Sequence, residues 1–531
     1  MPGEPSPSRG EVRTAEVIAT LCLATDMGMG FPLEHGLQST VVALRLAERL
    51  GVDPETATQT YYGCLLFYAG CTADAEISAE LFQEGSLLEH FIPVVFGSPV
   101  QTLGGIARAL ADPAAPPVLR AVQGASRLPK AARGHQSHIT AMCEVAQMLS
   151  DQTGAPPAVP GLFVHLTERW DGRGSARLRG DQIPLPLRIM HVARDATFQS
   201  MLGGPEYAAG VVRARGGGAF DPDIATLLAN EAPAMLAVDE NASVWDETLA
   251  REPGPHLVLG GEEIDRALAA MGNFADLVSP FLVGHSAGVS RLAGLAAQRC
   301  GLPATEVLAV RRAALVHDLG RVAIHAGTWA KAASLTADEW ERVRLHAYHS
   351  ERILSRSPFL ADLCAIATRH HERIDGSGYH RGATAVSLAP AARLLAAADA
   401  YQAMTEPRPH RPALRPSQAA DTLAAEADAG SLDGDSVAAV LDAAGHRVAA
   451  PARPAGLTSR EAEVIGLLAR GLQTKQVGRA LGISAKTADH HVQNAYAKIG
   501  VSTRAAAALF AMQHGLTGWG ELPMARLADG S

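Results

Sequence analysis

The chain has 531 residues, of which 47% are hydrophobic and 19% are charged, and its formal net charge is −9. This length exceeds one ordinary hydrophobic core and predicts roughly three domains, and the composition excludes a disordered chain. The negative charge excludes general binding to polyanions, but residues 457–516 carry seven lysines and arginines against three acids. A basic end on an acidic body is typical of a nucleic-acid-binding module joined to other domains.

The N-terminus lacks the apolar stretch of a signal peptide, and no uninterrupted apolar run is long enough to span a membrane. None of the six cysteines has a C-x-x-C partner, so neither a zinc ribbon nor a disulfide framework is indicated. We therefore expect a cytoplasmic protein that makes no membrane contact.

An internal repeat begins near His35 and again near His285. In both copies apolar residues recur at three- and four-residue spacing, which predicts helices. Further along, the string WDGRGSARLRG at 170–180 resembles IDGSGYHRG at 374–382. Matching positions lie about 46 residues further apart in the first copy, which therefore contains an insertion.

Histidines and aspartates recur along the predicted helices of the second copy. A lone histidine on a helix is usually a core or surface residue, but seven such groups on apolar segments would be buried without partners. Two divalent cations would satisfy them. Imidazole with carboxylate favours iron, manganese, zinc or nickel over magnesium, and we expect iron or manganese. The candidate ligands are His285, His317, Asp318, His346, His370, His371 and Asp399.

The pair His317-Asp318, the string HHERIDGSGY from His370 and the later Asp399 resemble the HD-GYP subgroup of HD-domain phosphohydrolases in order and spacing. The resemblance covers about 170 residues. It implies that the seven residues hold metals and that the domain hydrolyses cyclic di-GMP or a related nucleotide. In such an enzyme the metals lower the pKa of a water and orient the phosphodiester, with Asp318 and Arg321 as catalytic residues. Arg321 is expected to bind a phosphate oxygen bidentately.

Three positions depart from the family's pattern. Arg321 stands where the family usually has lysine, His380 replaces the proline of the signature, and Phe281 stands where three-metal members carry glutamate. We therefore expect two metals and not three. Altered substrate choice and lost turnover both stay open, because arginine keeps the charge of lysine but not its geometry.

The first copy keeps His35 but loses the other ligand positions. Phe67 and Tyr68 replace the HD pair, Leu166 and Thr167 replace the HH pair, and Arg194 replaces Asp399. A site without these ligands cannot hold two cations, so we expect a degenerate domain. Packing against the second copy, dimerisation and ligand sensing remain alternative roles for it.

The C-terminal segment divides into short predicted helices. Thr458 and Glu461 form a capping box, Thr474 can cap a second helix, and Ser484 can cap a longer helix that ends near Ile499. Two short helices, a turn and a longer helix with polar exposed positions predict a helix-turn-helix.

This segment closely resembles the LuxR-type DNA-binding domain over about 60 residues, through the signature L-T-x-R-E-x-E-V and its later A-x-G, L-x-I-S and K-T matches. The resemblance implies a recognition helix over 485–499 that binds double-stranded DNA. Asp489 would face phosphate unfavourably, so we expect either a modest affinity or binding as a homodimer. The candidate DNA-binding residues are Lys486, Thr487, His490, His491, Gln493, Asn494 and Lys498.

The predicted fold is all-α, with two HD-type helical bundles followed by a four-helix LuxR-type helix-turn-helix domain. The predicted organisation is a disordered N-terminus (1–13), a degenerate HD-GYP-like domain (14–237), a connector (238–272), a metal-binding HD-GYP-like domain (273–448), a linker (449–456), a DNA-binding domain (457–518) and a tail (519–531).

The favoured function is a DNA-binding transcription regulator with a metal-dependent phosphodiesterase domain that acts on a cyclic dinucleotide or a related nucleotide. One alternative is a transcription factor that senses a nucleotide or a metal without turnover. Another is a scaffold built from inactive HD folds, which would hold no metal.

Overall fold

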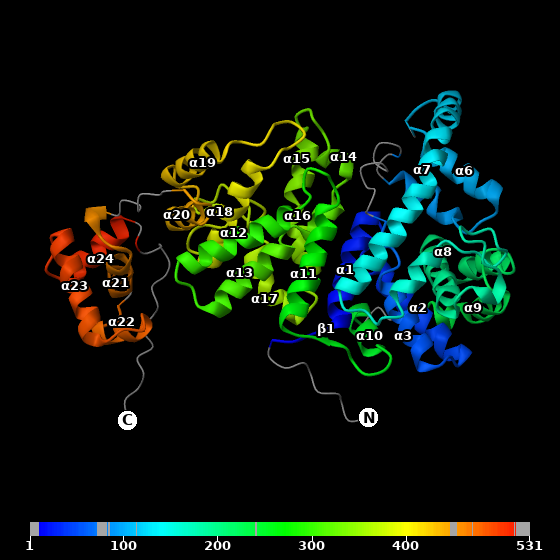
Figure 1. The fold of residues 1–531 in the computed structure, drawn as a ribbon, viewed down its shortest axis with the longest axis horizontal. Helices are drawn as coiled ribbons and strands as arrows, with labels where there is room; N and C mark the ends of the chain where they lie inside the picture. Colours follow the sequence, from blue (N-terminus) through cyan, green and yellow to red (C-terminus); the bar gives the residue numbers. More distant parts are fainter. Residues whose placement is uncertain are drawn as a thin grey trace.

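The computed structural model describes residues 10–446 apart from 72–81, 83–84, 113 and 239–241, and residues 454–516 apart from 470 and 515. The predicted all-α class is confirmed: in these ranges the named strands are the antiparallel two-residue pair β1 (Val12–Arg13) and β2 (Val258–Leu259) (Figure 1). Of the segments expected to be disordered, linking or terminal, residues 1–9, 449–453 and 519–531 lie outside the described residues. None of the described helices has the length and apolar character needed to cross a bilayer.

The first repeat copy folds into helices whose ends follow from local sequence. Asp53 caps α3 by accepting a hydrogen bond from the N–H of Thr56, and Pro54 occupies the first helical position, where its missing N–H is harmless. The described part of the insertion contains α6 and the start of α7. The elements are α1 (Thr14–Met29), α2 (His35–Leu50), α3 (Pro54–Leu65), α5 (Ser86–His90), η1 (Ile92–Val94), α6 (Pro99–Ala109), α7 (Pro117–Gln152), η2 (Pro160–His165), η3 (Gly180–Gln182), α8 (Leu185–Arg215), α9 (Pro222–Met235) and α10 (Val244–Ala250).

The second copy repeats the same helical order. Its elements are α11 (Gly261–Asp276), α12 (His285–Arg299), α13 (Ala304–Val316), η4 (Leu319–Ala323), α14 (Ala326–Trp329), α15 (Ala337–Arg344), α16 (His346–Leu354), α17 (Pro358–Ala367), α18 (Pro390–Thr405), α19 (Pro416–Asp428) and α20 (Gly434–Ala443).

Matching hydrogen bonds show that the two copies are structurally related. Asp26 accepts from the N–H of Gly36 at the start of α2, and Asp276 accepts from the N–H of Ser286 at the start of α12. The loops that follow are also alike, because the buried carboxylates of Glu168 and Glu372 each accept two backbone N–H groups eight to eleven residues later. These carboxylates hold the loop in both copies.

A hydrophobic core is shared by the first copy and part of the second, a further core lies within the second copy alone, and α1 packs directly against η4 and α16 of the second copy. Two polar contacts cross the junction: Ser357 donates to Glu16 at 2.6 Å, and Arg356 pairs with Glu34 at 2.7 Å. Figure 1 shows α1 beside α11 and α16. A conformational change in one copy can therefore be transmitted to the other through packed side chains.

Residues 238–272, expected as a connector, contain α10, β2 and most of α11. Trp245 and Leu259 are buried in the shared core, and α10 packs against α2. The segment therefore has a buried apolar face despite its acidic composition. Likewise Val12 and Arg13, expected in the disordered N-terminus, form β1, where Arg13 pairs with Glu252.

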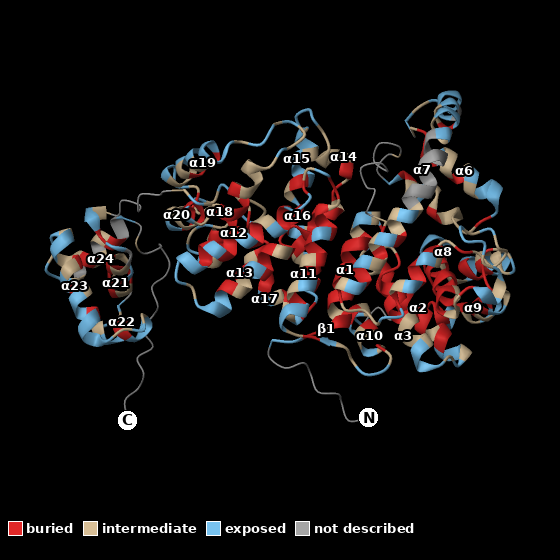
Figure 2. Cartoon of the chain, viewed as in Figure 1, coloured by how far each residue is buried: buried red, intermediate tan, exposed pale blue. Residues whose placement is uncertain are grey.

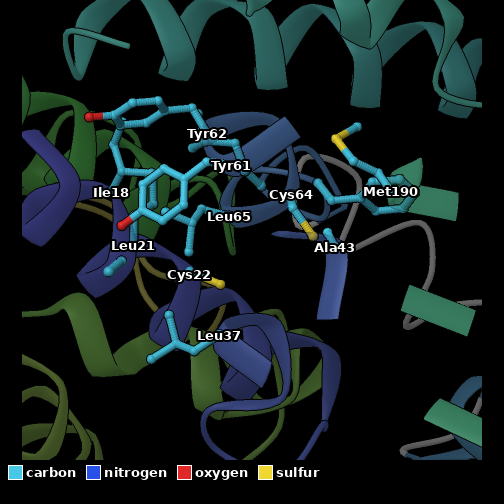
Figure 3. Close-up of a cluster of buried hydrophobic side chains, with 14 of the residues drawn as sticks. Ile18, Leu21, Cys22, Leu37, Ala43, Tyr61, Tyr62, Cys64, Leu65 and Met190 are labelled. Atoms are coloured by element: carbon cyan, nitrogen blue, oxygen red, sulfur yellow. The ribbon is translucent and has the colours of Figure 1, made fainter. Parts of the chain in front are cut away.

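Side chains of α1 and α3 form much of the interior of the first copy. Figure 3 shows Tyr61 and Tyr62 of α3 close to Ile18 and Leu21 of α1, and all four are buried. Buried residues continue along the central helices of both copies, while the upper end of α7 is exposed (Figure 2). The helices that carry the histidines of the second copy are therefore packed into these hydrophobic cores, which restricts their motion.

The C-terminal module contains η5 (Pro454–Gly456), α21 (Ser459–Ala469), α22 (Thr474–Ala480), α23 (Ala485–Ile499) and α24 (Arg504–Gln513). Thr458 and Glu461 form the predicted capping box, and Ser484 caps α23 through the N–H of Thr487 at 3.0 Å. Thr474 is not a cap: it is the first residue of α22, and Gln473 precedes it. The helices enclose a small core that includes Val464, Ile465, Val477 and Val492.

Candidate metal centre

The seven predicted ligands come together from five segments of the second copy, and we call this cluster the metal centre. Their donor atoms form two groups, each within 4.8 Å. Ligand atoms lie about 2.0–2.2 Å from a transition metal, so opposite ligands are about 4 Å apart and each group has the size for one ion. One group is His346, His370 and His371, and the other is His285, His317, Asp318 and Asp399.

Backbone carbonyls orient three of the imidazoles. In His317, His346 and His370, Nδ1 donates to the carbonyl oxygen three residues earlier, which is Ala314, Val343 or Ala367. When such a ring is neutral, its Nε2 atom carries the lone pair. Such a contact to Nδ1 fixes the tautomer that a metal ligand needs.

Asp318 lies between the two groups. Its Oδ1 is 3.3 Å from Nε2 of His346 and 3.4 Å from Nε2 of His370, while its Oδ2 is 2.9 Å from Nε2 of His317. Both oxygens and this Nε2 are buried without a hydrogen bond of good geometry. Polar atoms buried without hydrogen-bond partners are costly, and divalent cations held by these residues would satisfy them. The residues present therefore fit a pair of divalent ions.

The pKa values at the metal centre keep His317 and Asp318 charged and His370 neutral. Burial opposes charge on His317, but the carboxylates of Asp318 and Asp399 raise its pKa to about 10. Burial also opposes charge on Asp318, yet Arg321 and His317 hold its pKa well below the usual range. Burial lowers the pKa of His370 to about 4, which keeps that ring neutral and able to bind a cation.

The predicted DNA-binding residues lie on α23, which spans the expected 485–499. Lys486, Thr487, His490 and Gln493 are exposed, whereas His491 and Asn494 are partly buried. Lys498 instead pairs with the buried capping residue Glu461 at 2.6 Å. Its charge thus serves the fold of the module, and it is less available to DNA than the other candidates.

Comparison with known families separates the chain into the same two parts. Residues 270–435 match the HD domain family, and residues 455–511 match the bacterial regulatory proteins of the luxR family. The chain carries an HD domain followed by a luxR-family domain.

Relatives extend the similarity beyond the HD domain. The chain is 26% identical over 405 residues to 3′3′-cGAMP-specific phosphodiesterase 3 of Vibrio cholerae, covering 75% of this chain and 88% of that protein. A crystal structure of a cyclic GMP-AMP-specific phosphodiesterase of V. cholerae has a TM-score of 0.56 at 23% identity and covers 83% of this chain and 99% of that one. The first repeat copy and the HD domain thus share their fold with that protein.

A shorter match concerns the HD domain alone. The chain is 38% identical over 127 residues to the cyclic di-GMP phosphodiesterase response regulator RpfG of Xanthomonas campestris, which is 24% of this chain and 34% of that protein.

Arg321, predicted to bind phosphate, instead pairs with Asp318: its Nη2 lies 2.7 Å from Oδ2. The side chain is buried, and its Nε and Nη1 atoms have no hydrogen-bond partner. Arg321 therefore neutralises the central carboxylate, and the N–H groups of its Nε and Nη1 atoms stay unpaired.

His380, which replaces the signature proline, contacts Glu351 of α16 at 3.1 Å, and Arg381 pairs with the same carboxylate. The substituted residue therefore joins the loop after α17 to the helix that begins with His346.

Sequence reasoning missed Glu406, which lies just beyond α18. Its carboxylate accepts a hydrogen bond from Nδ1 of His285 at 2.8 Å, and Arg408 pairs with it at 3.0 Å while donating to the carbonyl oxygen of Phe281. The signal was present, because Glu406 follows Asp399 by seven residues, or two helical turns. Glu406 gives His285 the oriented tautomer that carbonyls give to the other rings.

Replacing Glu406 by alanine should weaken metal binding about 10- to 100-fold, because His285 loses the carboxylate that orients its ring. Chelator competition with Mn²⁺ on the full chain measures this change. Glu306→Ala removes an exposed carboxylate from α13 and serves as the matched control. Equal affinities in both variants would contradict a positioning role for Glu406.

In the first copy, the position of the metal centre is filled by rings and a cation. The guanidinium of Arg194 lies 3.9 Å from the ring centre of Tyr68 and 4.6 Å from that of Phe67, and it donates to the carbonyl of Cys64. His35 stacks on Phe31 at 4.5 Å, and burial with Arg194 lowers the pKa of His35 to about 3. Leu166 is buried, and Thr167 contacts Ser175. At these positions the first copy therefore has the positive charge of Arg194 and apolar side chains where the second copy has carboxylates.

Proposed function

We propose that this chain is a DNA-binding transcription regulator whose HD domain hydrolyses a cyclic dinucleotide with the help of two divalent cations. The observation that carries the proposal is the position of Asp318, whose two oxygens face two separate groups of imidazoles. Bound divalent cations would supply Lewis acidity toward a water and the phosphodiester. The free N–H groups of Arg321 suit a phosphate oxygen. The names of the relatives support a cyclic dinucleotide as substrate.

A turnover assay tests the enzymatic part. The full chain, loaded with Mn²⁺ or Fe²⁺, is incubated with 3′3′-cGAMP or cyclic di-GMP, and linear products are separated by chromatography. Product from the unmodified chain and none from His317→Ala supports hydrolysis. Metal and nucleotide binding without product would reject it in favour of a sensor, and absence of bound metal would leave only a scaffold.

One observation favours the sensor as the second candidate. Arg321 lies on Asp318 in an ion pair that is almost fully buried, and this pairing opposes a second cation at the same oxygen. A domain that binds one ion and a nucleotide without turnover would show this arrangement. Counting metal ions per chain by elemental analysis separates one ion from two.

The luxR-family domain supplies the DNA-binding part of the proposal, and a homodimer remains a prediction. Replacing Lys486 by alanine should weaken binding similarly for all DNA sequences and reduce the slope of log Kobs against log salt by about 0.9, because one phosphate contact is lost. Lys498→Ala is the matched comparison: it removes the partner of Glu461 and should lower the stability of the module with an unchanged salt slope. Equal slope changes in both variants would contradict this assignment. Fluorescence anisotropy across a salt series measures the slopes.

The proposal includes a signal that passes from the HD domain to the DNA-binding module. Its support is the packing of α1 on η4 and α16, together with the presence of the DNA-binding module on the same chain. Measuring DNA affinity with and without bound cyclic dinucleotide tests it, and equal affinities would reject coupling.

A further inference from the structure

A row of flat side chains leads from the metal centre to the surface. The ring of Tyr379 stacks on His371, with ring centres 4.7 Å apart and planes 27° from parallel. The guanidinium of Arg344 lies 5.4 Å from the ring centre of Tyr379 and 5.9 Å from that of Trp340. Trp340 is 44% exposed, which is unusual for so large an apolar side chain. One end of the row therefore lies at His371, a candidate metal ligand, and the other end, Trp340, lies in solvent.

Arg344 retains hydrogen-bonding capacity in this row. Its Nε atom is buried without a hydrogen-bond partner, and its Nη1 makes a long contact of 3.3 Å with the exposed Glu341. Arg344 is also two residues before His346, so the row is joined through the chain to the metal centre. A ligand held at the metal centre has a cationic donor and flat rings beside it.

The helix that presents Trp340 and Arg344 is fixed at its start. Thr336 and Glu339 form a capping box on α15, and Lys331 pairs with Glu339 at 2.6 Å. Two short contacts at one helix end restrict its motion. Trp340 and Arg344 are therefore held ready for a ligand, and less ordering is required on binding.

We infer that Trp340, Arg344 and Tyr379 form a platform that binds a purine base of the cyclic dinucleotide while its phosphodiester lies at the metal centre. The inference rests on the proposed function. Indole, phenol and guanidinium planes are the surfaces on which nucleobases stack in proteins, and Arg344 adds a hydrogen-bond donor for a base edge. The platform determines affinity for the base, whereas the metal centre acts on the phosphodiester.

Kinetics on two substrates test the platform. The Mn²⁺-loaded full chain is assayed with 3′3′-cGAMP and with methyl p-nitrophenyl phosphate, a phosphodiester without a purine. Trp340→Ala should raise KM for the dinucleotide about tenfold, with kcat and the turnover of the small diester unchanged. Trp340→Phe should restore most of the affinity, because a smaller ring still stacks.

Binding is measured separately by the quenching of tryptophan fluorescence with a phosphorothioate analogue of the dinucleotide. Quenching should fall in Trp340→Phe, where only Trp329 beside His346 still reports on the site, and it should persist in full in Trp170→Phe, which alters a tryptophan of the first copy. An unchanged KM in Trp340→Ala, or loss of both substrates together, would overturn the platform while the proposed hydrolysis stands. Binding without turnover overturns hydrolysis alone, since the quenching arm still reports on the platform. Neither binding nor turnover in the unmodified chain overturns both.

Discussion

Replacing Asp318 by asparagine is expected to remove the metal ions of the proposed centre and to reduce the proposed dinucleotide hydrolysis by about a thousandfold or more. Asp318 is the described side chain whose oxygens face both imidazole groups, at 2.9 Å from His317 and 3.3 Å from His346. The amide of asparagine loses the negative charge and presents an N–H₂ group where one ion requires a lone pair. Arg321 would also lose its buried partner, which adds an unpaired charge.

Elemental analysis of the purified variant gives the metal content, and product formation gives the rate. Asp362→Asn makes the same change at an exposed position of α17 and should leave both unchanged. Thermal unfolding separates loss of metal from loss of fold. A folded Asp318→Asn protein with two metals per chain would disprove the bridging role, even if its rate were low.

The sequence predicts the order of the ligands well because all but Asp399, which lies inside α18, are at a helix start, a helix end or a loop held by local hydrogen bonds. His285 and His346 begin helices, and Nδ1 of His346 bonds three residues back along the chain. The same holds for the helix-turn-helix, where the capping residues Thr458 and Ser484 act on neighbours three residues away. Short-range rules suffice for such features.

Contacts between distant segments were not predictable in the same way. Glu406 bonds to His285 across 121 positions, and Lys498 pairs with Glu461 across 37. The sequence shows the charge of each residue but not its partner, so it predicts a DNA contact for Lys498 without its ion pair to Glu461 and gives no role to Glu406. The burial of residues in 238–272 was also not predictable from the acidic composition of this segment, although Trp245 and Leu259 pack into the shared core.

Replacing Gly320 by alanine is expected to destabilise the HD domain by about 3 kcal/mol and to abolish metal binding. A Cβ at this position would lie under 3.0 Å from the carbonyl oxygen of His346 and the backbone nitrogen of Ser350. The N–H of Gly320 also donates to Ser350 Oγ, whose hydroxyl in turn donates to the carbonyl of His317. Relief of the clash must move η4 and α16 apart, and that movement separates Asp318 from His346.

Denaturant unfolding with and without Mn²⁺ measures both effects. Gly434→Ala is the control: its Cβ would meet nothing within 4 Å at the start of α20, so stability should stay equal or rise slightly. Gly70 occupies the equivalent place after Phe67-Tyr68, where a Cβ would meet the backbone of Met142 in α7. The close approach thus survives in the copy that has lost the ligands. If Gly320→Ala keeps its metal, the close backbone contact does not hold η4 against α16 in the second copy. If Gly70→Ala keeps its stability, the same is true of the contact with α7 in the first copy.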